Sequence, residues 1–376
     1  DVGSLDAALL IGFPGTIAST WQQAGRAGRR ESESAAVLLG HNAPIDQYLM
    51  ANPEYFFGRT PENAVCDPGN AHLLLNHLRC AAFEIPIRRE EEGAFGDQAP
   101  AILDLLQQHG HVREVKGRWF YTREDYPSAG VSLRNAGDNV YTILDTTAGG
   151  EAARGGEAAG AQGKTRVLGT IDELSAFWQV HPQAVYMHEG DTYFVDRLDL
   201  GEKSAYVHRA DLEYYTQAVS DSHIEASEPD LERRWRQAGL SFGPCSVHDK
   251  VTMFKKIRFG GRDSLGFGQI DLPHTTLHTT ALWLVPSAEA LRKVIDHGRV
   301  PADGLQGIAN VLLHTVSLHV MCDPLDLGVV IEMRNVQGPT LFLYDKYPGG
   351  LGYAQRAWHL IEAVSYTHLT LPTSSE

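Results

Sequence analysis

The sequence predicts a multidomain protein of mixed α/β and α+β class, and three observations lead to that prediction. Its 376 residues suffice for two or three domains at roughly 150 residues each. Strand and helix patterns alternate over residues 1–55, as they do in a parallel α/β sheet. Two helical patterns and a strand follow in residues 56–145, and residues 166–364 combine short strands with long helical patterns.

The first segment, residues 1–55, starts with Asp rather than Met, so we expect the natural start to lie upstream. Its apolar runs Ala7–Ile11 and Ala35–Leu39 predict two strands, and the stretch from Ile17 to about Gly28 between them predicts a helix. These elements suggest the end of a parallel α/β domain.

Residues 56–145 are expected to form a winged-helix-like module. Apolar residues at helical spacing in Asn70–Phe83 and Pro100–His109 predict two helices, and Trp119–Tyr121 predicts the strand that follows. Residues 146–165 are rich in Gly and Ala and contain almost no large apolar residue, which predicts a flexible insertion.

The rest of the chain is expected to hold two more domains. Short apolar runs joined by E-G-D and L-G-E-K turns predict a small β module in residues 166–235. Residues 236–364 predict an α+β domain with a long helix, Pro301–Val320, and a last helix, Gly352–Val364, after a Pro-Gly-Gly turn. Residues 365–376 change character abruptly, so we interpret them as a foreign tail.

The charge balance limits the kinds of function. With 32 Lys and Arg against 47 Asp and Glu, the net charge of −15 argues against a protein that coats nucleic acid over its whole surface. Any contact with nucleic acid must be local. The four cysteines are far apart, which fits a reducing compartment, and we expect a cytoplasmic protein without a membrane span or secretion signal.

The segment that carries recognisable chemistry is residues 22–29, with the pattern Q-x-x-G-R-x-G-R. Arg26 and Arg29 stand three residues apart and share one helical face, which Gly25 and Gly28 allow to approach another surface closely. Two guanidinium groups suit a phosphate whose charge grows during phosphoryl transfer. The alternative is a solvated basic turn at the end of a surface helix.

This pattern resembles motif VI of the superfamily 2 helicases, and the opening D-V-G resembles the tail of their motif V. The resemblance implies that Arg29 is the arginine finger on the ATP γ-phosphate, that Arg26 makes a second phosphate contact, and that Gln22 is a positioning residue. Four residues are implied to couple the nucleotide to the bound strand: Asp1, Gly3, Gly25 and Gly28.

The longer phrase GFPGTIASTWQQAGRAGRR, residues 12–30, resembles the MrfA-like (mitomycin repair factor A) subfamily of DEAD/DEAH-box helicases. Further phrases at residues 67–86, 182–200, 214–218 and 343–353 extend the resemblance over most of the chain. It implies the C-terminal part of an ATP-dependent DNA helicase, beginning in the second RecA-like domain. ATP and Mg²⁺ are the implied cofactors, single-stranded or forked DNA is the implied partner, and DNA repair is the implied role.

Two consequences concern cofactors. No Walker A sequence occurs in these residues, so we expect the nucleotide cradle and the Mg²⁺ ligands upstream and predict that this fragment alone lacks ATPase and unwinding activity. In the resembling helicases the C-terminal domain binds zinc through a cysteine cluster after the P-G-G-x-G helix. That cluster is absent here, so no metal ligand is assigned in this chain, and Zn²⁺ binding by the intact protein and its oligomeric state stay open.

Two basic and aromatic stretches predict local contacts with nucleic acid, by phosphate pairing and base stacking. On the expected wing, Arg118 stands beside Trp119. For both stretches the alternative is an ordinary half-buried strand, whose residues also alternate between two faces. The other stretch contains five of the candidate residues: Lys250, Phe254, Lys255, Lys256 and Arg258.

Two further alternatives remain. The P-G-G-L-G turn at residues 348–352 lies between a strand and a helix, where backbone N–H groups can bind phosphate, but a tight turn supported by Asp345 explains it as well. For the whole protein, the alternative is a non-enzymatic scaffold that binds nucleic acid or protein. A Walker A sequence and a D-E-x-[HD] box in frame upstream would favour the helicase.

Overall fold

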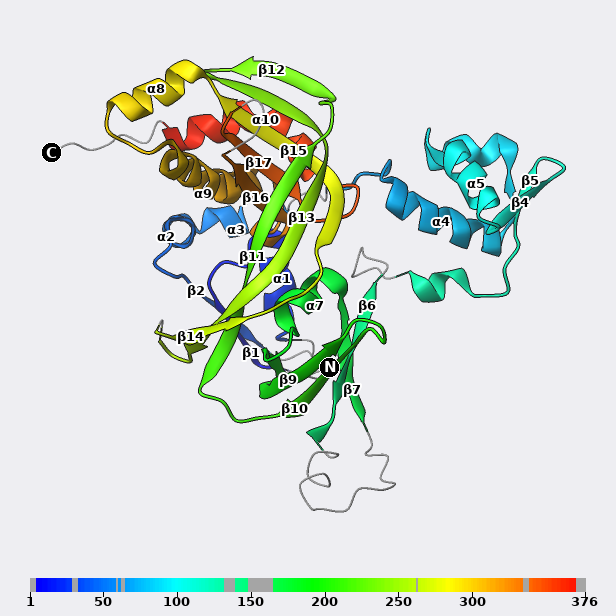
Figure 1. Ribbon diagram of the computed structural model, residues 1–376, viewed down its shortest axis with the longest axis horizontal. Helices are drawn as coiled ribbons and strands as arrows, with labels where there is room; N and C mark the ends of the chain where they lie inside the picture. Colours follow the sequence, from blue (N-terminus) through cyan, green and yellow to red (C-terminus); the bar gives the residue numbers. More distant parts are fainter. Residues whose placement is uncertain are drawn as a thin grey trace. The chain divides into compact units, whose positions relative to one another are not determined.

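The structure is a computed structural model that describes residues 5–28, 33–58, 60–61, 65–131, 139–147, 165–261, 263–333 and 338–369. The chain divides into two compact units, of which the first comprises Asp1–Asn70, Ile224–Ser246 and His278–Glu376, and the second Ala71–His223 and Val247–Leu277. Parallel α/β, purely antiparallel and helical parts all occur, which confirms the predicted class (Figure 1). No helix within these residues is long and apolar enough to cross a membrane.

The first unit begins with a strand–helix–strand segment, as predicted. The two strands pair in parallel, and Leu38 packs against a small core of Ile17, Leu49 and Phe56. The intervening helix is capped by Thr16, whose side chain accepts a hydrogen bond from the Ser19 N–H. The elements are β1 (Ala7–Ile11), α1 (Ile17–Ala24), β2 (Ala35–Leu39), α2 (Pro44–Ala51) and α3 (Glu54–Phe57).

One face of this two-stranded sheet is bare. Leu9 pairs in register with Val37, and Ile11 with Leu39, and all four side chains are between 43% and 72% exposed. Parallel sheets are normally covered by helices on both faces. The described part of this segment is therefore an incomplete α/β layer.

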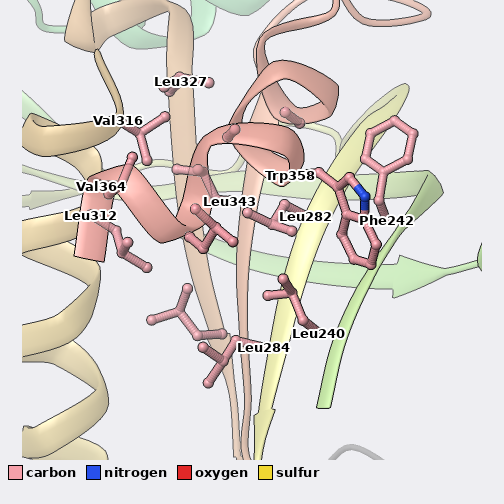
Figure 2. Close-up of a cluster of buried hydrophobic side chains, with 14 of the residues drawn as sticks. Leu240, Phe242, Leu282, Leu284, Leu312, Val316, Leu327, Leu343, Trp358 and Val364 are labelled. Carbon is pink, nitrogen blue, oxygen red and sulfur yellow. The ribbon is translucent and has the colours of Figure 1, made fainter. Parts of the chain in front are cut away.

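The rest of the first unit is an α+β structure. The buried strand β17 lies between β15 and β16 and is antiparallel to both. Figure 2 shows how Leu282 and Leu343 of the sheet meet Trp358 and Val364 of the last helix. The elements are β12 (Leu231–Trp235), β13 (Ala238–Arg258), β15 (Thr275–Pro286), α8 (Ala288–Asp296), α9 (Pro301–Val320), η3 (Pro324–Asp326), β16 (Leu327–Glu332), β17 (Thr340–Asp345) and α10 (Tyr353–Leu369). Three strands contribute residues to both units: β11 (Tyr214–Ala226), β13 and β15.

The last helix, α10, differs from the sequence prediction. It was expected to end near Val364, but it continues to Leu369. The interpretation of residues 365–376 as a foreign tail stays a prediction, whereas the predicted end of the helix is five residues too early. The reason is that S-Y-T-H-L contains no proline or glycine that would stop a helix already begun.

The second unit contains a helical module with a three-stranded sheet of order β3-β5-β4. Its core joins the two helices to the sheet through residues such as Leu78, Leu103 and Trp119. Both predicted helices and the strand are present, with a β-hairpin that forms the wing. The elements are α4 (Ala71–Glu84), β3 (Ile87–Arg88), η1 (Arg89–Phe95), α5 (Ala99–Gln108), β4 (Val112–Val115), β5 (Arg118–Tyr121) and η2 (Pro127–Gly130).

The second unit also contains a five-stranded sheet of order β7-β6-β10-β9-β8, in which only β6 and β10 are parallel. Its core includes Tyr141, Phe177 and Val195. Residues 148–164 of the predicted flexible insertion lie outside the described residues. The elements are β6 (Val140–Asp145), β7 (Arg166–Asp172), α7 (Glu173–Gln179), β8 (Val185–His188), β9 (Asp191–Asp199) and β10 (Ser204–Arg209). Two further strands, β11 (Tyr214–Ala226) and β14 (Ser264–Gln269), pair with β13 instead.

Candidate nucleotide and nucleic-acid contacts

The arginine-rich motif forms the end of α1 and the turn after it. Gln22 lies in the last turn of the helix, and Gly25 closes the helix through a hydrogen bond of 2.8 Å from its N–H to the Trp21 carbonyl. Arg26 follows in the turn, with its N–H bonded to the Gln23 carbonyl at 3.2 Å. Gln22, Gly25 and Arg26 are exposed, and no described carboxylate forms an ion pair with Arg26. Gln22 and Arg26 thus present their side chains to solvent.

Gly28 returns the chain to the sheet. Its N–H donates to the carbonyl of Leu5 at 2.9 Å, next to the parallel bridge between Leu5 and Ala27. Its φ of +76° is a left-handed conformation that favours glycine, and a Cβ would lie 2.2 Å from the Ser34 hydroxyl oxygen. The backbone at position 28 therefore requires glycine. The next residue, Arg29, lies outside the described residues, as do Asp1 and Gly3.

The predicted role of Phe254 in base stacking is wrong. The Phe254 side chain is 0% exposed, because its ring packs against Gly268 and against His181, with ring centroids 4.9 Å apart. Lys256 covers the same face, with its ammonium group 5.4 Å from the ring centre of Tyr214. Both side chains belong to the packing of the sheet.

The other basic residues of this stretch are arranged differently. Lys250 forms an ion pair of 3.3 Å with Asp271. Lys255 and Arg258 are exposed. Opposite Lys255 lies Phe267 of β14, which is 64% exposed. Sequence reasoning missed Phe267, although Leu265, Gly266, Phe267 and Gly268 alternate large and small residues, a signal that one face of this strand is large and the other flat.

On the wing, the predicted role of Trp119 is also wrong. Its ring is 2% exposed, and its indole N–H donates to the buried carboxylate of Glu92 at 2.6 Å. Arg118 is exposed on the other face of the hairpin, opposite Val115. This outer face carries two arginines and two apolar residues: Arg113, Val115, Arg118 and Phe120.

The Pro-Gly-Gly turn is closed by Asp345 rather than open to a phosphate. The Asp345 carboxylate is fully buried and accepts hydrogen bonds of 2.7–3.1 Å from the backbone N–H groups of residues 351–354. Burial raises the pKa of Asp345, and these four hydrogen bonds oppose that rise. Because the carboxylate occupies the donors at the start of α10, the alternative of a turn supported by Asp345 is correct.

Comparison with known proteins shows which proteins this chain resembles. Models of the winged helix domain of ATP-dependent helicase HRQ1 and of the MrfA Zn-binding domain match residues 66–136 and 308–373. The chain is 38% identical over 363 residues to the uncharacterized ATP-dependent helicase YprA of Bacillus subtilis, covering 95% of this chain and 46% of that protein. The crystal structure of the helicase MrfA bound to DNA matches with a TM-score of 0.64 and 36% identity, over 100% of this chain and 48% of that one.

The predicted resemblance to the MrfA-like helicases is confirmed. A second MrfA structure, bound to DNA and AMPPNP, matches with a TM-score of 0.62 and 35% identity. The ATP-dependent helicase hrq1 of Schizosaccharomyces pombe is 30% identical over 217 residues, which cover 57% of this chain and 19% of that protein. The chain spans less than half the length of each of these relatives.

The residues of the MrfA Zn-binding domain match do not fit a zinc ion. Residues 308–373 contain one cysteine, Cys322, and the described residues hold no group of three potential metal ligands. Cys322 lies in the hydrophobic core after α9, where burial raises the pKa of its thiol to about 12. A buried neutral thiol without a second soft ligand is a poor zinc ligand. Cys322 is thus a core residue.

Proposed function

We propose that this chain is the C-terminal part of an ATP-dependent DNA helicase. The observation that carries the proposal is the likeness of the whole chain to a helicase crystallised with DNA, together with the motif at residues 22–29. In this proposal, residues 1–55 end the second RecA-like domain, and the helices and three-stranded sheet within residues 56–145 form a winged-helix module. The β module expected in residues 166–235 also takes in β6 (Val140–Asp145), which pairs with β7 and β10. Residues 236–364 form the beginning of an MrfA-type C-terminal domain.

The bare face of β1 and β2 supports the assignment of the first segment. Four exposed apolar side chains on one face of a parallel sheet require cover from further chain. A larger RecA-like domain would supply that cover. In this proposal, β1 and β2 are neighbouring strands of its sheet, and the motif lies at the end of the helix that joins them.

The proposed chemistry is electrostatic. ATP supplies the phosphoryl group whose negative charge grows as its bond to the leaving phosphate breaks. Arg29 acts as the arginine finger on that charge, Arg26 makes a second contact, and Gln22 positions them. The loss of the γ-phosphate removes the charge to which both guanidinium groups bind, which releases the two RecA-like domains from one another. Gly25 and Gly28, with Asp1 and Gly3, couple this release to the bound strand.

DNA contacts are proposed on exposed side chains only. Arg118 of the wing and Lys255 and Arg258 of β13 carry positive charge at the surface of an acidic protein. The partner is proposed to be single-stranded or forked DNA, in a cytoplasmic repair process. Mg²⁺ and ATP are proposed to bind upstream, and any Zn²⁺ of the intact protein is proposed to bind outside this chain.

ATP turnover by two proteins tests this proposal. The intact parent protein is expected to hydrolyse ATP faster in the presence of single-stranded DNA, whereas the 376-residue chain is expected to show no turnover. The purified parent and the purified chain are compared in one steady-state assay with and without DNA. A parent that does not hydrolyse ATP would overturn the proposal, and turnover by the chain alone would contradict the assignment of the nucleotide cradle to upstream residues.

A further inference from the structure

The β13–β14 hairpin has one exposed face and one packed face. Antiparallel register places Lys255 directly opposite Phe267, and Met253 opposite Gln269, so these four residues share one face. All four are exposed, with Phe267 at 64% and Met253 at 36%. We call this set the Phe267 face.

The packed face holds the Phe267 face in place. Phe254 lies opposite Gly268, where a Cβ would be 2.3 Å from the Phe254 ring, so the ring fills the space that a side chain would otherwise take. This packing fixes the register of β14 against β13. A slip of β14 by one residue would turn Phe267 onto the packed face, where the Phe254 ring already lies, so this packing keeps Phe267 outside.

We propose that the Phe267 face binds single-stranded nucleic acid, with the Phe267 ring stacked on a base and Lys255 paired with a phosphate. The proposal deepens the DNA-helicase function proposed above, on which it rests, by adding a contact site for the strand. The stacking role predicted for the buried Phe254 is thus assigned to Phe267, whose exposed ring a base can reach. Stacking of a base on an exposed aromatic ring contributes about 1–3 kcal/mol and tolerates any base.

Local charge favours a polyanion as the occupant of this face. Residues 250–271 contain five basic and two acidic side chains, within a chain whose net charge is −15. One basic side chain, Lys250, is already paired with Asp271. Lys255 has no ion-pair partner among the described residues, so its ammonium group is available to a phosphate beside the Phe267 ring.

The chain offers a matched pair of lysines for the test. Lys255 and Lys256 are adjacent and carry the same charge, but Lys256 packs over Tyr214 and Phe254 on the opposite face. Phe259 is the control for Phe267. It is also a partly exposed phenylalanine, at 39%, but its ring packs against Tyr215, with ring centroids 5.6 Å apart. The binding of fluorescein-labelled oligothymidine to the 376-residue chain is measured by anisotropy over a series of salt concentrations.

Two results are expected. Phe267→Ala lowers the affinity about 5- to 150-fold, the loss of one stacked base, whereas Phe259→Ala has a much smaller effect. Lys255→Gln reduces the slope of log affinity against log salt by about 0.7, the loss of one phosphate contact on a single strand, whereas Lys256→Gln leaves the slope unchanged. Urea unfolding of each variant checks that the hairpin is intact, as expected for exposed positions.

Several results would overturn the proposal. These are no binding of oligothymidine by the wild-type chain, unchanged binding by both Phe267→Ala and Lys255→Gln, or equal effects of Lys255→Gln and Lys256→Gln. Unchanged binding by Phe267→Ala and Lys255→Gln would indicate that the Phe267 face contacts a protein partner instead. The proposed function is tested separately, by DNA-stimulated ATP hydrolysis of the parent protein. A failure of this binding site is therefore distinguishable from a failure of the proposed function.

Discussion

The side-chain amide of Asn70 donates a hydrogen bond of 2.6 Å to the carbonyl oxygen of Gly350, which lies 280 positions away in the sequence. The same amide donates to the carbonyl of Pro348 at 2.8 Å, and Asn70 is only 3% exposed. A Cβ at Gly349 would lie 2.9 Å from the amide nitrogen, so the turn needs glycine at this point. Asn70 therefore holds the segment before α4 against the turn before α10 through two hydrogen bonds.

Removal of this amide should destabilise the first unit. Asn70→Ala leaves two carbonyl groups without their donor, and we expect the free energy of unfolding to fall by about 2 kcal/mol. Urea unfolding measures the change. Gln306→Ala is the control, because Gln306 is exposed on α9 and its side-chain amide donates a hydrogen bond to the exposed Asn310. Its effect should stay within about 0.5 kcal/mol. Equal effects of the two substitutions would contradict this role of Asn70.

Asp345 should stabilise the fold by accepting backbone hydrogen bonds, rather than by binding a ligand. Asp345→Asn keeps the shape of the side chain but turns one acceptor into a donor that faces backbone N–H groups, and we expect a loss of about 2–3 kcal/mol in the free energy of unfolding. Asp303→Asn, in the exposed first turn of α9, is the matched control and should cost about 0.3–1 kcal/mol. Chemical denaturation compares the two variants, and a neutral effect of Asp345→Asn would reject this role.

His181 should make the second unit sensitive to acid. The ring is fully buried, its Nδ1–H donates to the Pro182 carbonyl at 2.9 Å, and Nε2 has no hydrogen-bond partner among the described atoms. Burial lowers the pKa of His181, so the native state holds the ring neutral while the unfolded chain binds a proton at a pKa of about 6.5. The stability that depends on the neutral ring is present above that pH and is lost as the pH falls below it.

Unfolding in urea between pH 8 and pH 5 measures this effect, a range that spans the ordinary pKa of histidine, about 6.5. His181→Phe should flatten the fall in stability toward acid pH, even if the substitution lowers stability at pH 8. His274→Phe, at an exposed position of the same unit, should leave the pH dependence as it is in the wild-type chain. Identical pH profiles for all three proteins would contradict the role of His181.

Patterns local in sequence predicted the fold well. The strands at Ala7–Ile11 and Ala35–Leu39 and the helix at Pro301–Val320 have the predicted bounds, because apolar periodicity and proline at a helix start are properties of a few neighbouring residues. The predicted helix after Ile17 ends earlier, at Ala24, because Gly25 closes it.

Which side chains of a strand are exposed could not be predicted in the same way. A basic and aromatic strand has two faces, and only pairing with the neighbouring strand decides which face is buried. Phe254 is buried because Gly268 lies opposite it, and Trp119 is buried because Glu92 accepts its N–H. Neither partner is near in sequence, and the same is true of Asn70 and Gly350.

The central claim is that Arg29 acts as an arginine finger in the parent helicase, and ATP hydrolysis by the intact parent with single-stranded DNA tests it most directly. The sequence supplies a matched control in the adjacent Arg30. We predict that Arg29→Ala lowers kcat about 1,000-fold or more, with DNA binding unchanged, and that Arg30→Ala has little effect. Full DNA-stimulated turnover by the Arg29→Ala protein would contradict the claim.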